Sequence, residues 1–201
     1  MSERVLQVLR EKFPKAVLET HSHLGDDTAV IAATQWKQVC AFLRDDSQMG
    51  FDMFIDLCGM DYPSREPRFE VVLHLYSIAR RHRVRLKTRI GDSEGDDAVV
   101  DSVVDVWAGA GWFERECFDM FGVTFRGHPD LRRILMYPEF EGHPLRKDYP
   151  ADKTQPLVPY RSEAEAGLPL EKLAPFGSDE GMHFGRRGFM PGPATDRHGD
   201  S

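Results

Sequence analysis

The sequence predicts an α+β domain, in which a small, mainly antiparallel sheet has helices packed on it and is followed by an extended C-terminal strap. Residues 69–76 and 84–90 alternate apolar side chains with polar or charged ones, which is the period of a strand with one buried face. Residues 4–13 and 112–121 repeat apolar side chains at steps of three and four, which indicates amphipathic helices. Neither period continues after Pro150, so the folded domain is expected to end there.

The N-terminal part of the chain predicts a helix, a hairpin and a second helix. The helix over 4–13 is followed by two segments rich in β-forming residues, 16–20 and 28–32. A Gly-Asp-Asp turn lies between these segments, so we expect two antiparallel strands. Thr34 is then expected to cap the second helix, whose apolar face would lie within 36–43.

The middle of the chain predicts three successive strands. An apolar run over 51–60 precedes the alternating segments at 69–76 and 84–90, and the connections between them are short. This order favours an antiparallel meander with helices on one face. The acidic, glycine-containing residues 91–97 are expected to form a surface loop, and residues 98–107 a short helix.

The last part of the chain differs in composition from the rest. Seven of the thirteen prolines lie from Pro150 to Ser201, and no apolar stretch of helical length occurs there. Such a segment cannot bury enough apolar surface to fold alone. We therefore expect a domain over 1–150 and a tail over 151–201 that wraps a partner subunit. The alternative is a disordered tail.

Charge and hydropathy exclude several classes of protein. The formal net charge of −7 argues against a nucleic-acid-binding protein, which would carry a basic stripe. No apolar run is long enough to span a bilayer. Residues 1–12 alternate charged and apolar side chains and do not resemble a signal peptide. We expect a cytosolic protein that reaches a membrane only through a partner.

The cysteines and glycines give no sign of a cofactor site. Cys40, Cys58 and Cys117 are far apart in the sequence and none belongs to a Cys-x-x-Cys pair, so three reduced, mostly buried thiols are expected. No glycine-rich phosphate loop follows a predicted strand. The chain is therefore expected to hold no catalytic residues, no metal, no iron–sulfur cluster, and no NADH or flavin.

The last predicted helix carries charged residues among its apolar ones. Arg115 and Asp119 have the i, i+4 spacing of a helical ion pair. Gly122 is expected to end the helix in a left-handed conformation. Glu116 falls within the apolar stripe, so we expect it to be partly buried and to pair with a later arginine such as Arg146.

Two similar turns follow this helix. They read Gly-His-Pro-Asp-Leu-Arg-Arg at 127–133 and Gly-His-Pro-Leu-Arg-Lys-Asp at 142–148. Proline favours extended geometry at the preceding His128 and His143, and glycine permits a positive φ. The turns should form two rigid corners rich in arginine, a residue that is enriched with aromatics in interface cores. The candidate interface residues are Glu114, Arg115, Glu116, Asp119, Arg126, His128, Asp130, Arg132, Arg133, His143, Arg146, Lys147 and Asp148.

Other interpretations compete with an interface. His128 and His143 could bind a metal, but Pro, Gly and Arg surround them instead of a converging set of ligands. The tripeptide His-Pro-Asp at 128–130 also occurs in J-domain co-chaperones, which have a basic preceding helix, whereas the helix here is acidic and aromatic. Cys117 could be a nucleophile, but it falls on the predicted buried face. The arginines could also form a solvated basic face.

Three runs carry a resemblance to a known family. They are Glu-Arg-Glu-Cys-Phe-Asp-Met-Phe-Gly at 114–122, Gly-His-Pro-Asp-Leu-Arg-Arg-Ile-Leu at 127–135 and Gly-His-Pro-Leu-Arg-Lys-Asp-Tyr-Pro at 142–150. Together they closely resemble the signature of the C-type subunit of bacterial NADH:quinone oxidoreductase, respiratory complex I, whose mitochondrial counterpart is called the 30-kilodalton subunit. A looser version of this signature occurs in membrane-bound nickel–iron hydrogenases and related complexes.

The resemblance implies a subunit without redox centres in the peripheral arm of a translocase that passes electrons from NADH to quinone, coupled to proton translocation. It implies packing against the D-type subunit of that complex, near the I-type and B-type subunits, on the cytoplasmic side of the bacterial cell membrane. FMN, iron–sulfur clusters and quinone would be bound elsewhere in the complex. The alternatives are the equivalent subunit of a hydrogenase-like complex and a free-standing adaptor protein.

Overall fold

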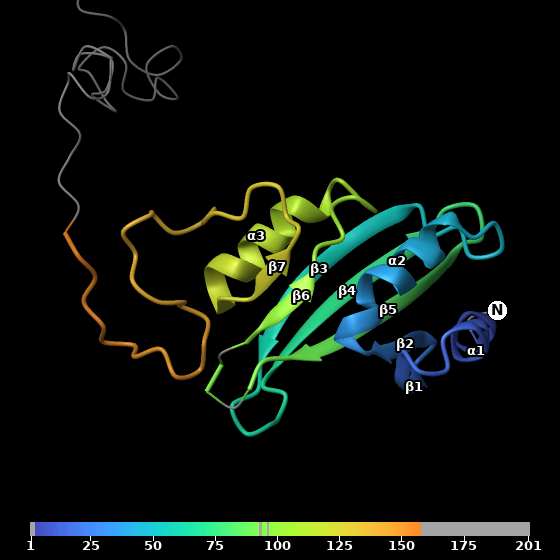
Figure 1. The fold of residues 1–201 in the computed structure, drawn as a ribbon, viewed down its shortest axis with the longest axis horizontal. Helices are drawn as coiled ribbons and strands as arrows, with labels where there is room; N and C mark the ends of the chain where they lie inside the picture. Colours follow the sequence, from blue (N-terminus) through green and yellow to red (C-terminus); the bar gives the residue numbers. More distant parts are fainter. Residues whose placement is uncertain (1–2, 93, 96, 158–201) are drawn as a thin grey trace, which may run out of the picture. The chain divides into compact units, whose positions relative to one another are not determined.

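Five strands form one mixed sheet in the order β1-β2-β5-β4-β3 (Figure 1). The computed structural model describes residues 3–92, 94–95 and 97–157. The strands are β1 (Val17–His23), β2 (Asp26–Ile31), β3 (Met53–Asp61), β4 (Phe69–Ser77) and β5 (His82–Ile90). The predicted N-terminal hairpin and the three-stranded meander are both confirmed as antiparallel pairs. They join through one parallel pair, β2 with β5.

The helices begin and end close to the predicted positions. They are α1 (Glu3–Lys12), α2 (Trp36–Asp45) and α3 (Ala110–Phe121), with a 3-10 turn, η1 (Ala33–Gln35), before α2. The buried face of α2 is the predicted one, Trp36 to Leu43 at helical spacing. Thr34 does not cap α2, because it lies inside the 3-10 turn and Gln35 takes the cap position without a side-chain hydrogen bond.

One face of the sheet carries the hydrophobic core. Alternate residues of the central strands, such as Leu73 and Leu86, are fully buried and pack in one cluster with Leu9 of α1, Trp36 of α2 and Cys117 of α3. All three helices therefore contribute to the core on one face, as the fold class requires. The prediction of an α+β domain is confirmed.

Residues 98–107 do not form the predicted helix. Instead β6 (Val99–Asp101) pairs in parallel with β7 (Thr124–Arg126) in a second, two-stranded sheet. The backbone N–H groups after β6 do not make the i to i−4 bonds of a helix. That of Ser102 donates to the carbonyl of Arg126, and that of Val103 donates to the side-chain carboxylate of Glu114 in α3. These bonds, together with the β-branched valines, favour strand and turn over helix.

The described residues up to Pro156 belong to one structural unit. Most of the predicted tail, residues 158–201, lies outside the described residues, so the expectation that it wraps a partner stays a prediction. Among the helices that the structure describes, none has the length and apolar character needed to cross a bilayer.

Candidate interaction surface

The end of α3 is shaped by a glycine with two roles. Gly122 has φ +79° and its N–H donates to the carbonyl of Phe118 at 2.8 Å, so the predicted left-handed end is confirmed. A Cβ at this position would also lie 2.7 Å from ring atoms of His143. Glycine is therefore required both by the backbone and by the close approach of the segment that follows β7.

Two carboxylates of α3 are buried, and neither is the predicted one. Glu114 and Asp119 are both fully buried, whereas Glu116 is exposed. The prediction for Glu116 is wrong because α3 turns Ala110, Glu114 and Cys117 toward the core, which places Glu116 on the opposite side. Arg146, its expected partner, donates instead to backbone carbonyls.

Glu114 is held by two donors from the turn after β6. The hydroxyl of Ser102 donates to Oε2 at 2.7 Å, and the N–H of Val103 donates to Oε1 at 2.8 Å. Burial raises the pKa of Glu114, and these two hydrogen bonds oppose that rise. The carboxyl therefore links α3 to the β6 end of the second sheet.

Residues 127–150 follow β7 and are called the wrapped segment. Asp119 binds this segment at the end of its first turn. Its carboxylate accepts a hydrogen bond from Arg133 Nη1 at 2.7 Å. It also accepts hydrogen bonds from the backbone N–H groups of Ile134, Leu135 and Met136 at 3.0, 2.8 and 2.8 Å. Burial alone would raise the pKa of Asp119, but these donors outweigh it and the pKa lies below its usual value. Successive backbone N–H groups around one anion form a stable nest.

The predicted ion pair between Arg115 and Asp119 is not formed. Arg115 donates to the carbonyls of Arg132 and Arg133 at 3.0 and 2.9 Å. The reason is tertiary: Asp119 is already surrounded by donors from the wrapped segment, and the carbonyls of that segment face the side of α3 that Arg115 occupies. The helix is thus joined to the segment by both of these residues.

The two histidines brace opposite ends of α3. His128 Nε2 lies 3.1 Å from the carbonyl of Gly111, and its Nδ1 accepts the N–H of Asp130. His143 Nδ1 donates to the carbonyl of Asp119 at 3.0 Å, and burial lowers the pKa of His143. The glycines before both histidines have the predicted positive φ. In the described part of the chain no three His, Cys, Asp or Glu side chains are grouped as metal ligands would be.

The second corner is fixed to the sheet by residues that sequence reasoning missed. Arg68, which is 3% exposed, donates to both oxygens of Asp61 at 2.8 Å and to Asp148 at 3.0 Å. The N–H of Lys147 donates to Asp61 Oδ2 at 2.8 Å. A signal was available, because Asp61 directly follows one predicted strand and Arg68 directly precedes the next.

Arg146 completes this corner. Its guanidinium donates to the carbonyls of Phe121 and Gly95 at 2.8 and 2.7 Å and lies 5.1 Å from the centre of the Phe69 ring. The remaining candidate residues lie apart at the surface. Arg126 pairs with Asp101 at 3.3 Å, and Arg132 pairs with Asp130 at 2.9 Å, both pairs being accessible to solvent.

Large apolar side chains remain exposed on α3 and the wrapped segment. Trp112 is 63% exposed, Leu135 57%, Leu145 50% and Tyr137 37%. Trp112 begins the apolar repeat of residues 112–121, but its side chain is exposed and the Arg115 guanidinium lies 5.3 Å from its ring centre. The buried charges thus order a segment that exposes several large apolar side chains among charged ones, and exposed apolar patches of this kind mark interaction sites.

The fold and this surface define a class of protein: an α+β domain with an ordered surface segment that exposes several apolar side chains. The sequence model of the respiratory-chain NADH dehydrogenase 30 Kd subunit family matches residues 29–155. The chain belongs to this family, and the resemblance drawn from the signature runs is confirmed.

Curated proteins with similar sequences have names that agree with this family. The C-type subunit of NADH-quinone oxidoreductase from Hyphomonas neptunium is 48% identical over 69% of this chain and 67% of its own length. The proteins of the same name from Roseiflexus castenholzii and Sinorhizobium medicae are 48% and 47% identical, over 73% and 71% of this chain and 82% and 69% of their own lengths. These relatives are subunits of an enzyme complex of respiratory electron transport.

Solved structures share the fold. A trypsin-resistant fragment (1–134) of Nqo5 is 31% identical, with a TM-score of 0.55 over 64% of this chain and 98% of the fragment. A chain of the membrane-bound sulfane sulfur reductase, an archaeal respiratory membrane complex, is 26% identical, with a TM-score of 0.63 over 75% of this chain and 86% of that chain.

Proposed function

We propose that this chain is a structural subunit, without redox centres of its own, in the peripheral arm of an NADH:quinone oxidoreductase. It holds the quinone-reducing module in place while electrons pass from NADH to quinone, coupled to proton translocation. The observation that carries this proposal is the wrapped segment. Buried Asp119 and Asp61 fix its backbone, while Trp112, Leu135 and Leu145 stay exposed.

The partners and cofactors follow from this role. The D-type subunit would pack on the surface made by α3 and the wrapped segment, with the I-type and B-type subunits nearby, on the cytoplasmic side of the bacterial membrane. FMN, iron–sulfur clusters and quinone would be bound by other subunits of the complex. Support comes from the cysteines, since Cys40 and Cys117 are buried in the core and burial raises the pKa of both thiols, which disfavours metal ligation.

The rigid segment also suits the proposed role physically. Arginine–carboxylate pairs and backbone bonds hold both corners before any partner arrives, so little conformational entropy is lost on association. Exposed Trp and Tyr are among the residues that dominate interface energetics. A subunit of this kind would fix the distances between neighbouring subunits without taking part in electron transfer itself.

A second candidate is the equivalent subunit of another respiratory membrane complex. The similarity to a chain of the sulfane sulfur reductase complex supports this second candidate. A nickel–iron hydrogenase or a related complex would use the same fold and the same wrapped segment. A free-standing adaptor is the remaining alternative, and it predicts that no redox subunit associates.

The test is a native pull-down of the tagged full-length chain from detergent-solubilised host membranes, followed by mass spectrometry and an NADH:quinone activity assay. Recovery of a homologue of the D-type subunit with flavin and inhibitor-sensitive activity is expected. Recovery of a nickel–iron large subunit would favour the second candidate, and recovery of the chain alone would favour the adaptor.

Surface variants then locate the contact. Trp112→Ala and Leu145→Ala should each reduce the recovered D-type subunit about tenfold or more, the loss expected for an interface hot spot. The turnover of each complex that still assembles should stay normal. Ile78→Ala is the matched control, because Ile78 is also 60% exposed but lies outside this surface. Normal assembly with lost turnover would contradict a structural role.

A further inference from the structure

Strand β1 is a free edge of the main sheet. Within the described residues it pairs with β2 alone, so one side of its backbone has no strand partner. β1 contains no proline, and five of its seven residues are exposed, whereas five of the six residues of β2 are buried. Unprotected edge strands are templates for the addition of another strand.

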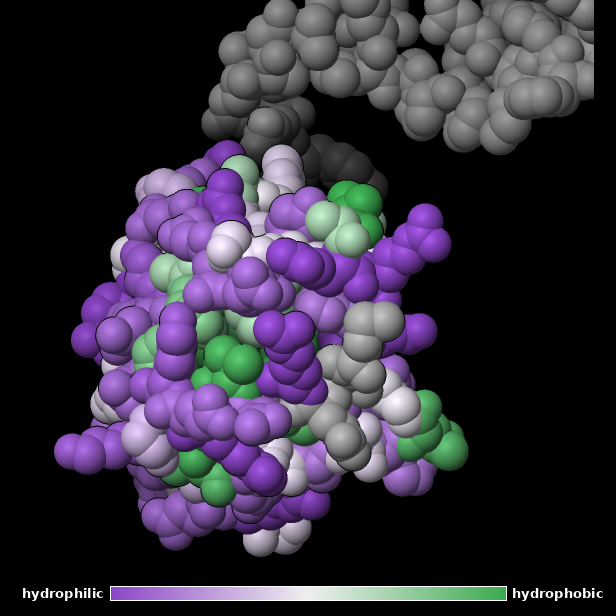
Figure 2. All heavy atoms as spheres, turned by 90° about the vertical axis from the view of Figure 1, so that its right-hand side faces the viewer, coloured by the Kyte–Doolittle hydropathy of each residue, from purple (hydrophilic) through white to green (hydrophobic). Residues whose placement is uncertain are grey.

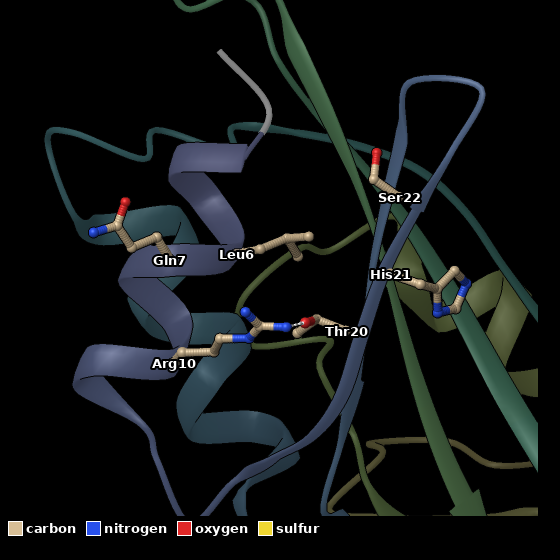
Figure 3. Close-up of a pocket in the computed structure, with 6 residues that line it drawn as sticks. All are labelled: Leu6, Gln7, Arg10, Thr20, His21 and Ser22. Atoms are coloured by element: carbon tan, nitrogen blue, oxygen red, sulfur yellow. Dashed lines mark hydrogen bonds between the residues drawn. The ribbon is translucent and has the colours of Figure 1, made fainter.

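A groove runs beside this edge. It has a volume of about 430 Å³ and lies between α1 and β1, where it is lined by Leu6, Gln7, Arg10, Thr20, His21 and Ser22. Figure 3 shows Leu6 and Arg10 pointing from α1 toward β1, with Gln7 directed away from the strand and His21 pointing away on the far side of β1. Thr20 and Ser22 are the alternate residues on the helix side. An edge strand beside a helix groove is a geometry that binds extended peptides by strand addition.

The groove has an uncompensated positive charge. Arg10 hydrogen-bonds Thr20 Oγ1, and no carboxylate pairs with it in the part of the chain that the structure describes. The nearby acids are engaged elsewhere, because Glu11 accepts from Gln7 at 2.9 Å and Glu19 from Arg89 at 2.9 Å. A cation left free in a chain of net charge −7 favours an acidic ligand at this position.

We propose that the edge of β1 and its groove bind an extended segment of another subunit, which adds as a sixth strand and places a carboxylate against Arg10. Backbone hydrogen bonds would supply the affinity, and the ion pair with Arg10 would fix the register of the added strand. Short Thr20 and Ser22 leave room for the added side chains, which point alternately into and away from the groove.

Surroundings of the groove agree with a partner that is a polypeptide. Figure 2 views the domain from the side where α1 lies, and small apolar patches are visible there between mainly hydrophilic side chains. Leu18, on the same strand, is 60% exposed. A second copy of this chain fits poorly, since pairing two β1 edges would bring two Arg10 grooves together without a carboxylate for either.

This inference rests on the proposed function only for the source of the strand, another subunit of the assembly. The test compares amide hydrogen exchange of residues 17–23 in the isolated full-length chain and in the complex recovered with it. Exchange in the complex is expected to be at least about tenfold slower, since added strand hydrogen bonds protect amides.

Matched charge variants test the role of Arg10. Arg10→Glu should leave the complex assembled but abolish the protection of residues 17–23. Arg44→Glu, on the exposed side of α2, should leave that protection unchanged. Equal exchange of residues 17–23 in the isolated chain and in the complex would overturn this inference while leaving the proposed function intact.

A photo-crosslinker in place of Ser22 identifies the occupant independently. Cross-linking to a segment of another subunit that contains Asp or Glu is the expected result. Cross-linking to a second copy of this chain, to lipid or to nothing would overturn the proposed occupant. If no other subunit is recovered with the chain, both this inference and the proposed function fail.

Discussion

At the scale of single residues, the buried charges of α3 determine how the wrapped segment is held. Glu114 and Asp119 are both fully buried, yet their pKa values shift in opposite directions. Burial raises the pKa of Glu114, whereas hydrogen bonds from its donors lower the pKa of Asp119. The difference lies in the donors: Glu114 has a neutral hydroxyl and one N–H, whereas Asp119 has a guanidinium and three N–H groups. Charged and multiple donors stabilise a carboxylate far more than neutral ones.

Glu114→Gln tests the pH dependence that this environment implies. Because the folded pKa is raised above the usual 4.5, the folded state binds more protons than the unfolded state between these two values. The contribution of Glu114 to the free energy of unfolding therefore falls as pH rises through that window and is constant above it. Relative to the unsubstituted protein, Glu114→Gln should gain stability over the same window.

Urea unfolding at a series of pH values measures this difference. Glu116→Gln on the same helix is the matched control, because it removes an exposed carboxylate. The same pH dependence in both variants would contradict the interpretation that burial of Glu114 is the cause.

Asp119→Ala should be much more damaging. It leaves Arg133 and three backbone N–H groups without their acceptor, and breaking a buried pair costs about 3 to 5 kcal/mol of unfolding free energy. Asp130→Ala removes a carboxylate from a solvated pair with Arg132 and should cost less than about 1 kcal/mol. Chemical denaturation of both variants checks the contrast, and equal losses would count against a special role for Asp119.

At the scale of elements, the contact between α3 and β3 depends on a glycine in the strand. A Cβ on Gly59 would lie 2.7 Å from Cys117 Sγ and 2.8 Å from Phe121 Cδ2. The helix therefore approaches the sheet more closely than any side chain at this position of β3 would allow. This approach brings Asp119 and Gly122 within reach of the wrapped segment.

Gly59→Ala is expected to lower the free energy of unfolding by about 1 to 3 kcal/mol, the usual cost of overpacking. Cys117→Ala added to that variant should restore part of the loss, because it removes the sulfur that the new methyl group meets. Cys40→Ala, buried in α2, should restore none. Thermal or urea unfolding measures the stability of these variants. If Cys117→Ala restores none of the stability lost in Gly59→Ala, this account of the packing is wrong.

At the scale of the whole domain, Arg68 joins three distant parts of the chain. Its guanidinium bonds Asp61 at the end of β3, Asp148 of the wrapped segment and the carbonyl of Glu94 in the loop after β5. The wrapped segment is therefore attached to one end of the sheet through the buried guanidinium of Arg68. Loss of this residue should affect both stability and the order of the segment.

Arg68→Met leaves Asp61 buried without its ion-pair partner, at a cost of about 3 to 5 kcal/mol in unfolding free energy. Trypsin should also cleave after Arg146 and Lys147 faster than in the unsubstituted protein, because the segment is released from the sheet. Arg126→Met, which removes a solvated pair, is the control. Unchanged cleavage at these two sites would contradict the role given to Arg68.

Several features could be predicted from local sequence because they depend on local physics. The alternation at 84–90 follows from one face of β5 being buried, and the left-handed end of α3 follows from Gly122 lacking a Cβ. The strand at Val99–Asp101 was missed, because its pairing partner is β7, which lies more than twenty residues later in the sequence.

The sequence by itself determined the fold class, the meander, the three helices and the segment that carries the family signature. Periodicity and turn residues act over a few positions, so these features can be inferred without tertiary contacts. Only the tertiary structure decided which carboxylates are buried, which acceptor each arginine finds, and that Arg68 and Asp61 anchor the second corner. A charged side chain takes its partner from whatever distant segment is brought beside it, and that depends on how all the elements pack together.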